Sequence, residues 1–236
     1  MVYGAGVNAS RTARERARAE LVAEITAAAR RQLADTGAAA LSMRAVSREL
    51  GMVSSALHRY FPTRDDLLTA LIVQSYDALA DAVEAAVDGV PDPVDRWRTL
   101  ARAVRSWALA NPHEYALIYG SPVPGYRAPA DTVPAAARGI APLGRLLADA
   151  HAAGLLTVDP TPVPPGPADD AARLRAALHT PDLPDGTLLA VITAWTGLFG
   201  HLSFELFGQF EKVLEHRDTA FDAAVERLGR IVGLHV

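Results

Sequence analysis

The sequence predicts an all-α protein. β-branched and aromatic residues do not alternate over any window long enough to form a strand, so strand signals are nearly absent. Helix signals recur instead, for example where Leu21, Ile25 and Ala28 return at helical spacing with Arg and Glu on the other face. Of the 236 residues, 50% are hydrophobic and 21% are charged, which is enough apolar material for a sizeable core. We therefore expect one or two domains of packed helices.

The N-terminal region predicts three helices, two of them short. The signals give a helix at 14–36 ended by Gly37, a helix at 43–50 capped by Ser42, and a helix near 53–60 after a turn at Gly51. Two short helices joined by a glycine turn and supported by a first helix form a helix-turn-helix. Helices this short are marginal alone, so we expect packing on neighbouring helices to hold them.

The remaining sequence predicts a larger helical part. Thr63 with Asp65 and Asp66 provides an N-cap and an acidic first turn, and Asp92 followed by Pro93 provides another helix start. Further helices are expected at 64–88, 93–110, 112–119, 133–155, 187–208 and 218–233, with a proline-rich connection over 157–185 that holds one short helix at 169–178. No fixed period relates the helix pairs, so a solenoid is not expected.

Charge is distributed unevenly along the chain. Residues 1–64 hold ten Arg and five acidic residues, a balance of +5, whereas the whole chain carries −4. A basic N-terminal part on an acidic body indicates a polyanionic partner for the first part, although a plain solvated face would give the same count. We expect a DNA-binding domain with a basic N-terminal arm over 1–62 and a ligand-binding and dimerisation domain over 63–236.

One segment carries a family resemblance. The stretch SMRAVSRELGMVSSALHRYFPTRDDLLTAL resembles the DNA-binding segment of the TetR family of transcriptional regulators. The matching marks are the capped short helix, the Val-Ser-x-x-Leu-Gly run, the Ser-Ser-Ala-Leu recognition helix, and Tyr-Phe-Pro with a basic residue before Asp-Asp-Leu-Leu. Farther along, AWTGLFGHLSFELFG resembles the Trp-His-Gly type of ligand-binding domain, with Phe199 where that label has His. The resemblance implies a DNA-binding regulator that responds to a ligand.

The resemblance also implies a set of DNA-contacting residues. They are Arg44, Ser54, Ser55, Ala56, His58, Arg59, Tyr60, Thr63 and Arg64. Arg44 can reach a guanine edge or a phosphate, and the small residues let the backbone approach bases closely. His58 stands where the family usually has Tyr, so it can contact a base or a phosphate. Arg64 replaces the common Lys, where a phosphate would also meet the N-terminal dipole of the fourth helix.

Each of these residues has a plainer reading. Arg44 can be a solvated surface residue, and Ser54 can be a simple helix cap. The arm arginines can lie along the DNA backbone or in a minor groove, or they can belong to a solvated tail; these residues are Arg11, Arg14, Arg16 and Arg18.

The helix over 187–208 is apolar on nearly every side, so it must be buried all round. A membrane span is the alternative, but His201 and Glu205 oppose it and no second span exists. We predict a homodimer in which a flat line on this helix meets the last helix in a four-helix bundle. The predicted interface residues are Ala190, Ala194, Gly197, His201, Phe221, Val225 and Leu228.

Aromatic and polar residues in the middle helices predict a ligand pocket, with ordinary core packing as the alternative for each. The candidates are Tyr76, Trp97, Trp107, His113, Tyr115, Tyr119, Tyr126 and Phe199. Charges do not cluster among them, which favours a small, largely apolar or aromatic effector.

The sequence offers no catalytic set. It has no Cys, no nucleophile elbow, no phosphate loop and no dinucleotide fingerprint, and the His residues lack the spacing of a metal site. We therefore expect no enzyme activity, no cofactor and no metal. The first residues lack the apolar run of a signal peptide, so a reducing cytoplasm is expected. A repressor released from a palindromic operator is the favoured function; an activator, or a helical binding protein whose helix-turn-helix does not bind DNA specifically, is the alternative.

Overall fold

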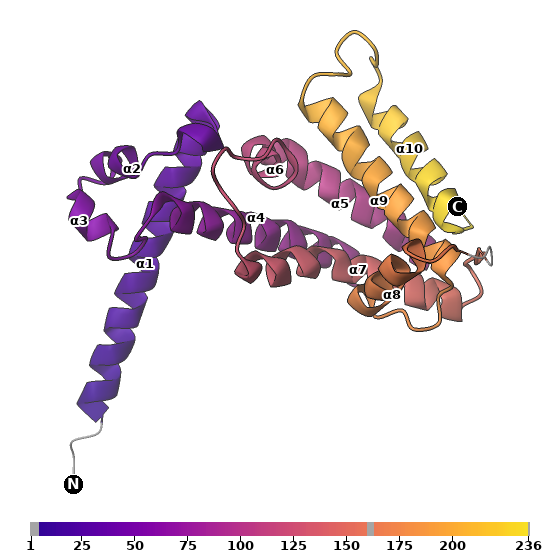
Figure 1. The fold of residues 1–236 in the computed structure, drawn as a ribbon, viewed down its shortest axis with the longest axis horizontal. Coiled ribbons are helices and arrows are strands. Elements are labelled where there is room, and N and C mark those ends of the chain that lie inside the picture. The colour runs from indigo at the N-terminus through magenta and orange to yellow at the C-terminus, as the bar shows by residue number, and fades with distance from the viewer. Residues whose placement is uncertain (1–4, 160–162, 236) are drawn as a thin grey trace. The chain divides into compact units, whose positions relative to one another are not determined.

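The computed structural model describes residues 5–159 and 163–235, with side chains from residue 13 onward. The described residues form α-helices and two short 3₁₀ turns, which confirms the all-α prediction (Figure 1). The helices are α1 (Ala5–Thr36), α2 (Met43–Glu49), α3 (Ser54–Leu57), α4 (Arg64–Val87), α5 (Pro93–Ala110), α6 (Pro112–Tyr119), α7 (Val133–Ala152), α8 (Pro167–Leu178), α9 (Asp185–Leu206) and α10 (Arg217–Val232), with η1 (Ala38–Ala40) and η2 (Ala130–Thr132) as the 3₁₀ turns.

The chain divides into two compact units. The first unit contains residues 1–74 and 121–130, and the second contains residues 75–120 and 131–236. This division differs from a boundary between residues 62 and 63, because α4 begins in the first unit and ends in the second and because the segment 121–130 packs with the first. The assignment of separate roles to 1–62 and 63–236 remains a prediction.

The first unit is built on α1, which is longer than predicted. The sequence predicted a helix from residue 14, whereas α1 begins at Ala5, so the basic arm is helical rather than an extended tail. The core of the unit contains Ile25, Leu33, Val46 and Leu57, each at most 2% exposed. The helix α2 packs against α1, and α3 packs against α2, so tertiary contacts hold the two short helices, as their length requires.

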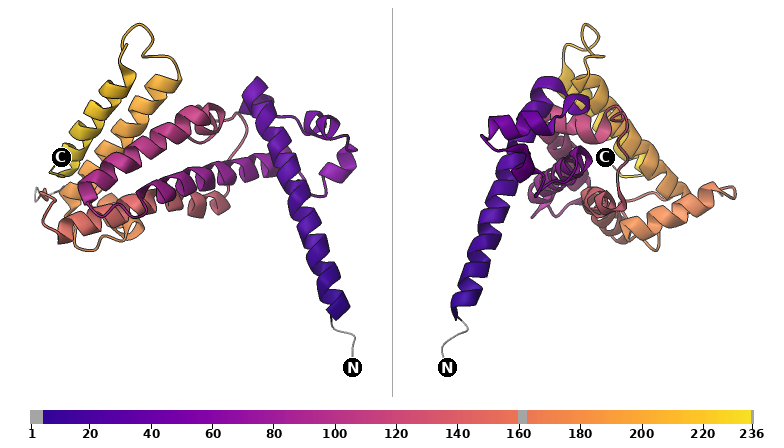
Figure 2. Two further views of the ribbon diagram at one scale, coloured as in Figure 1. Left: turned by 180° about the vertical axis from the view of Figure 1, so that it is seen from behind. Right: turned by 60° about the vertical axis from the view of Figure 1, so that its left-hand side comes forward.

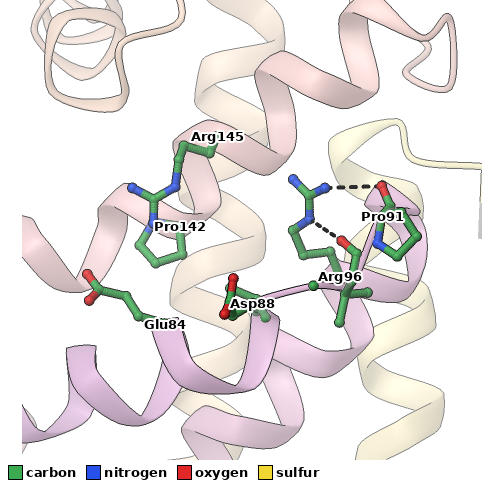
Figure 3. Close-up of a pocket in the computed structure, with 9 residues that line it drawn as sticks. Glu84, Asp88, Pro91, Arg96, Pro142 and Arg145 are labelled. Carbon is green, nitrogen blue, oxygen red and sulfur yellow. Dashed lines mark hydrogen bonds between the residues drawn. The ribbon is translucent and has the colours of Figure 1, made fainter.

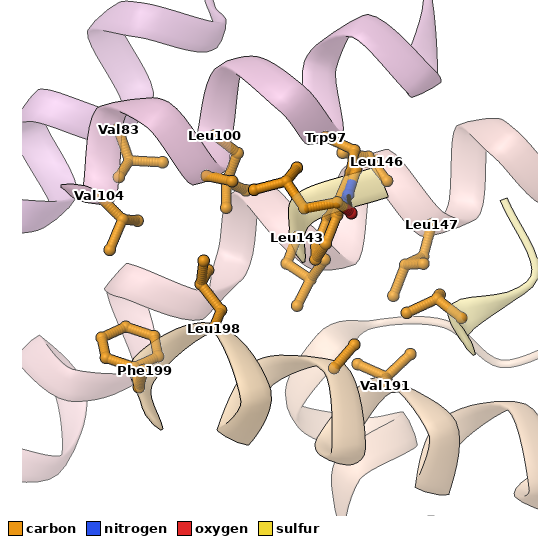
Figure 4. Packing of buried hydrophobic residues seen from close by; sticks show 14 of the residues in the cluster. Val83, Trp97, Leu100, Val104, Leu143, Leu146, Leu147, Val191, Leu198 and Phe199 are labelled. Atoms are coloured by element: carbon orange, nitrogen blue, oxygen red, sulfur yellow. Dashed lines mark hydrogen bonds between the residues drawn. The ribbon is translucent and has the colours of Figure 1, made fainter. Parts of the chain in front are cut away.

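The second unit is a bundle in which α9 and α10 form an antiparallel hairpin, visible in every view of Figures 1 and 2. Figure 4 shows α5, α7 and α9 meeting around buried Leu, Val and Phe side chains. Trp97 lies at this centre, 1% exposed, and its indole N–H donates to the carbonyl of Val225 over 2.9 Å. The satisfied indole lets a large polar-tipped side chain lie in an apolar core.

Ion pairs attach the hairpin to α5. Arg98 donates to both carboxylate oxygens of Glu226, and Arg102 donates to Asp222 over 2.9 Å. The Arg105 guanidinium donates to both oxygens of Glu205, whose side chain is only 4% exposed. Three successive turns of α5 therefore fix the position of α9 and α10.

By length and composition α9 could cross a membrane, and 39% of its most apolar window is buried inside the protein. Its apolar residues Leu188, Val191, Leu198 and Leu202 belong to the core of the second unit. The helix accordingly has one buried side and one side that its own chain leaves uncovered.

The proline-rich connection holds one helix, as predicted, although α8 begins at Pro167 rather than residue 169. Pro160, Thr161 and Pro162 of this connection lie outside the described residues.

Candidate DNA interface and effector site

The turn between α2 and α3 is closed by backbone hydrogen bonds. Gly51 has φ 64°, a left-handed conformation that favours glycine. The N–H of Met52 donates to the carbonyl of Ser47 over 2.8 Å, and the N–H of Gly51 donates to Arg48 over 3.2 Å. This pairing is the Schellman pattern of a helix C-terminus. Within α2 the Ser47 hydroxyl donates to the Met43 carbonyl. The two backbone bonds of the turn join α2 to α3 as a helix-turn-helix.

The start of α3 presents small side chains to solvent. Ser54 and Ser55 are exposed, Ala56 is half-buried, and Leu57 is completely buried beneath them. The Ser54 hydroxyl lies 3.4 Å from the Ser47 hydroxyl, so it also helps to close the turn. Leu57 orients the helix, and Ser55 remains free to meet a base edge.

The ring of His58 is oriented by a hydrogen bond within the chain. Its Nδ1 lies 2.9 Å from the carbonyl oxygen of Pro62, which can only accept, so Nδ1 carries the hydrogen. Nε2 is then left for a partner on DNA, either a base edge or a phosphate. The side chain is exposed.

Unpaired guanidinium groups surround the helix-turn-helix. Arg44 and Arg59 are exposed, and neither forms an ion pair with a carboxylate in the part of the chain that the structure describes. Tyr60 is half-buried, and the guanidinium of Arg18 stands 5.1 Å above its ring centroid. That contact ties α1 to the end of the recognition segment, and the sequence reasoning did not find it.

The start of α4 differs from the prediction. Thr63 caps the helix, since its N–H and hydroxyl both donate to Asp66 and the Asp66 N–H donates back to the hydroxyl. Arg64 turns inward: it donates to the carbonyls of Ala38, Ala39 and Leu41 over 2.8, 3.1 and 3.0 Å. A guanidinium with three internal acceptors holds the loop between α1 and α2, and its phosphate contact stays a prediction.

The aromatic candidates separate into a cluster and outliers. Tyr119 lies 4.2 Å from the Phe199 ring, 5.2 Å from Tyr115 and 6.1 Å from Tyr76, measured between ring centroids. Trp195, which was not predicted, adds a ring 4.8 Å from Phe199. These five rings come from α4, α6 and α9 and form one aromatic cluster in the second unit.

Hydrogen bonding distinguishes the tyrosines of the aromatic cluster. The Tyr115 hydroxyl donates to the Phe199 carbonyl over 3.0 Å and lies 2.9 Å from the Ser203 hydroxyl. The hydroxyls of Tyr76 and Tyr119 have no hydrogen-bond partner among the described residues. Burial raises the pKa of Tyr119, and its neighbours Tyr76 and Tyr115 raise it further, so its hydroxyl stays protonated as a donor.

The other predicted pocket residues lie elsewhere. Trp97 and Trp107 are buried core residues, and His113 is exposed on α6. Tyr126 belongs to the first unit, where its hydroxyl lies 2.9 Å from Thr69 Oγ1. The sequence could not separate core rings from lining rings, because both recur at the same helical spacing.

A cavity of about 400 Å³ lies at the C-terminal end of α4 and is lined by Glu84, Asp88, Arg96 and Arg145 among others (Figure 3). Arg96 is bound there to the carbonyls of Val90 and Pro91. The lining is charged, which does not match a largely apolar ligand. Among the described residues no group of three or more His, Asp or Glu is arranged to hold a metal ion.

The predicted dimer face is used within one chain. A Cβ on Gly197 would lie 2.6 Å from Leu228 Cδ2, so Gly197 marks the close approach of α10 to α9. Ala194, Phe221 and Val225 are at most 2% exposed in a single protomer. Ala190 and His201 are half-buried, and the His201 ring contacts Phe210 and Phe221. The small-residue line therefore packs against the protomer's own last helix, which sequence spacing alone did not reveal.

The side of α9 that its own chain leaves uncovered lies about 100° around the helix axis from the predicted line of small residues. This angle corresponds to a shift of one residue along the helix. Its exposed residues are Ile192, Thr193, Thr196, Gly200, Phe204 and Phe207. Ile192, Phe204 and Phe207 are 40%, 53% and 45% exposed, which is unusual for large apolar side chains on one stripe. We call this stripe the open face of α9.

The helix-turn-helix with small residues and free guanidinium groups on its outer side defines a DNA-binding regulator of transcription. The match to known families agrees: residues 25–71 match the model of bacterial regulatory proteins of the tetR family, and residues 97–228 match a tetracyclin repressor-like C-terminal domain. The chain therefore belongs to the TetR family. Its members are transcriptional regulators rather than enzymes.

Relatives cover nearly the whole chain. HTH-type transcriptional regulators of Mycobacterium bovis and Mycobacterium tuberculosis H37Rv are 41% identical over 231 residues, 94% of this chain and 96% of theirs. Among solved structures, the regulatory protein SCO4313 is 36% identical with a TM-score of 0.72, covering 91% of this chain and 97% of that one. A Rhodococcus sp. RHA1 protein of unknown function is 25% identical with a TM-score of 0.67, covering 92% and 96%.

Proposed function

We propose that the protein is a cytoplasmic repressor that leaves a palindromic operator when a small, largely apolar effector enters the aromatic cluster. The observation that carries the proposal is the pair of unpartnered hydroxyls, Tyr76 and Tyr119, beside apolar rings. Both side chains are only partly buried, so their hydroxyls are open to hydrogen bonding by a ligand or by water. An aromatic or alkyl effector with one hydrogen-bonding group would fill that arrangement.

The helix α4 supplies the coupling. Its first residues belong to the helix-turn-helix unit, and Tyr76 lies on the same helix in the aromatic cluster. An effector that moves Tyr76 moves α4, and with it the separation of two recognition helices in a dimer. Specific binding requires those helices about 34 Å apart, so a change of a few ångströms lowers operator affinity.

The dimer, in this proposal, forms through the open face of α9. A recognition segment this short needs two copies for a specific site, and a two-fold axis predicts a palindromic operator. The apolar residues Ile192 and Phe204 would lie at the centre of the interface. Ile192→Arg is expected to give monomers in sedimentation, whereas Val133→Arg, at an exposed apolar position on α7, leaves the dimer intact.

The repressor role is tested in two ways: by the output of a promoter reporter and by release of the protein from DNA. DNA bound by the purified protein is placed before a reporter, and effector candidates of graded polarity are screened for loss of binding. We expect the intact gene to lower reporter output and apolar phenols or ketones to restore it. Raised output in the presence of the gene would establish an activator instead.

The aromatic cluster is tested by conservative variants. Tyr119→Phe removes only the hydroxyl and is expected to weaken effector release about tenfold while DNA binding is unchanged. Trp107→Phe, in the core, serves as the matched control. Equal sensitivity of the two variants would place the effector site elsewhere, and the absence of specific DNA binding would favour a helical binding protein.

A further inference from the structure

The N-terminal part of α1 extends the helix-turn-helix unit. Figure 1 shows this part of the helix continuing well beyond α2 and α3. Residues 13–20 are exposed on every side, and they are mainly Ala, Arg and Glu. A helix segment with no packing is marginally stable, so an unpacked stretch of this length needs a reason.

The arginines of this stretch lie on different faces of the helix. With 100° between successive residues, Arg14 and Arg18 lie within about 40° of each other. The same face continues through Leu21 to Ile25, which is completely buried in the core of the unit. Arg16 lies on the opposite face, about 160–200° away. One face of α1 therefore changes from core-packing residues to arginines at the edge of the unit.

The contact of Arg18 shows where this face points. Its guanidinium stands 5.1 Å above the ring of Tyr60, at the end of the recognition segment. Arg14 is one turn farther along the helix, about 6 Å along its axis. Both are exposed, and in the described part of the chain neither pairs with a carboxylate. Their positive charge is thus left available on the side where α3 ends.

We propose that the Arg14–Arg18 face of α1 is a second DNA-contacting surface, which binds backbone phosphates beyond those that the helix-turn-helix reaches. The proposal rests on the DNA-binding function and names further residues for it. The partner is double-stranded DNA, because guanidinium groups spaced by one helical turn can meet successive phosphates of one strand. Contact with DNA also supplies the partner that the unpacked helix lacks.

Arg16 provides a matched control. Arg14→Ala and Arg16→Ala remove the same charge from the same helix and replace it by the same helix-favouring residue. The two substitutions differ only in which face of α1 loses its arginine. Neither should shift the unfolding transition, since both side chains are exposed.

The test measures anisotropy on two labelled duplexes at several salt concentrations. One duplex is enriched from random double-stranded DNA by the purified wild-type protein, and the other is its scrambled version. We expect Arg14→Ala to weaken binding to both about tenfold. The slope of log affinity against log salt should become shallower by about 0.9 for the lost phosphate contact. Arg16→Ala should change affinity less than about twofold, because only screened long-range charge is lost.

Equal effects of Arg14→Ala and Arg16→Ala would overturn the proposal and leave a diffuse charge effect. If no duplex is enriched, sequence-specific regulation fails, but the same comparison of variants on a duplex of random sequence still decides the role of the Arg14–Arg18 face. Arg18→Ala with Tyr60→Ala completes the series. If Arg18 acts only by packing on the ring, its substitution lowers stability without changing the salt slope, which contradicts the proposal for that residue.

Discussion

Several arginines of the helix-turn-helix unit differ from those that join helices in the second unit. In the helix-turn-helix unit, Arg14, Arg44 and Arg59 are exposed and have no carboxylate partner among the described residues. In the second unit, Arg98 and Arg105 each form ion pairs with two carboxylates. The Arg98 guanidinium keeps the pKa of Glu226 below its ordinary value. A paired guanidinium has few donors left for a ligand, whereas a free one retains all five for phosphates or bases.

The comparison shows that residue type alone does not indicate a role in this chain. Arg64 was grouped with the DNA-binding residues, yet it holds the loop after α1 through three carbonyls. The distinction depends on which partner the fold brings near, and it can be tested by removing one group at a time from each unit.

The largest effect on the free energy of unfolding is expected from a substitution in the core of the second unit. Trp97→Ala should lower the free energy of unfolding by about 4 kcal/mol, because it empties a fully buried site and leaves the Val225 carbonyl without its donor. Chemical denaturation measures the change. Trp195→Ala, at a half-exposed ring of the aromatic cluster, should cost much less; an equal cost would mean that the cluster is core rather than lining.

A buried ion pair should matter more than an exposed one. Glu205→Gln should destabilise the protein by about 3 kcal/mol, because it leaves the largely buried Arg105 without its main partner. Glu49→Gln breaks the exposed pair with Arg31, where both side chains are more than a third exposed. That change should cost less than about 1 kcal/mol. Similar costs in urea denaturation would contradict the distinction between the units.

Removal of a free guanidinium should affect binding and not folding. Arg44→Ala is expected to reduce affinity for the enriched duplex by about 1–3 kcal/mol and to relax specificity at one base pair, if Arg44 reads a base. The thermal midpoint should not move. Arg227→Ala, on the surface of α10, is the control. A loss of equal size on every sequence would make Arg44 a phosphate contact.

The smallest effect is expected from pH. Burial lowers the pKa of His201 from its ordinary 6.5, Arg105 adds to the decrease, and Glu205 opposes it. Its buried Nε2 has no hydrogen-bond partner. Since the unfolded chain then binds a proton more readily than the folded one, stability should fall as pH drops below about 6.5 toward the folded pKa.

His201→Phe should remove that part of the pH dependence, worth less than about 1 kcal/mol between about pH 7.5 and 5.5. Unfolding by urea at a series of pH values measures it. An identical pH dependence in the variant and the wild type would show that His201 is not responsible.

Much of the fold was predictable because its signals are local. Ser42 accepts from the N–H of Ala45, Asp92 accepts from the two residues after Pro93, and Gly51 takes the positive φ that the turn requires. These features depend on a few neighbouring residues, so sequence patterns identify them. The helix-turn-helix residues follow from the same turn.

The contacts that the sequence did not indicate join distant segments. The approach of Leu228 to Gly197 and the inward turn of Arg64 join residues far apart in the chain, and nothing in their own neighbourhood indicates the partner. Helical periodicity gives a residue a face but does not say which helix covers it. For this reason the sequence did not indicate that α10 of the same protomer covers the line of small residues on α9.

The most direct test of the account is the wild-type protein's anisotropy on the enriched and the scrambled duplex at a low and a higher salt concentration. The account predicts that the preference for the enriched duplex persists at the higher salt, because base contacts depend less on counterion release than phosphate contacts do. Equal binding to both duplexes, lost steeply with salt, would contradict it and leave only the attraction of free arginines to phosphate.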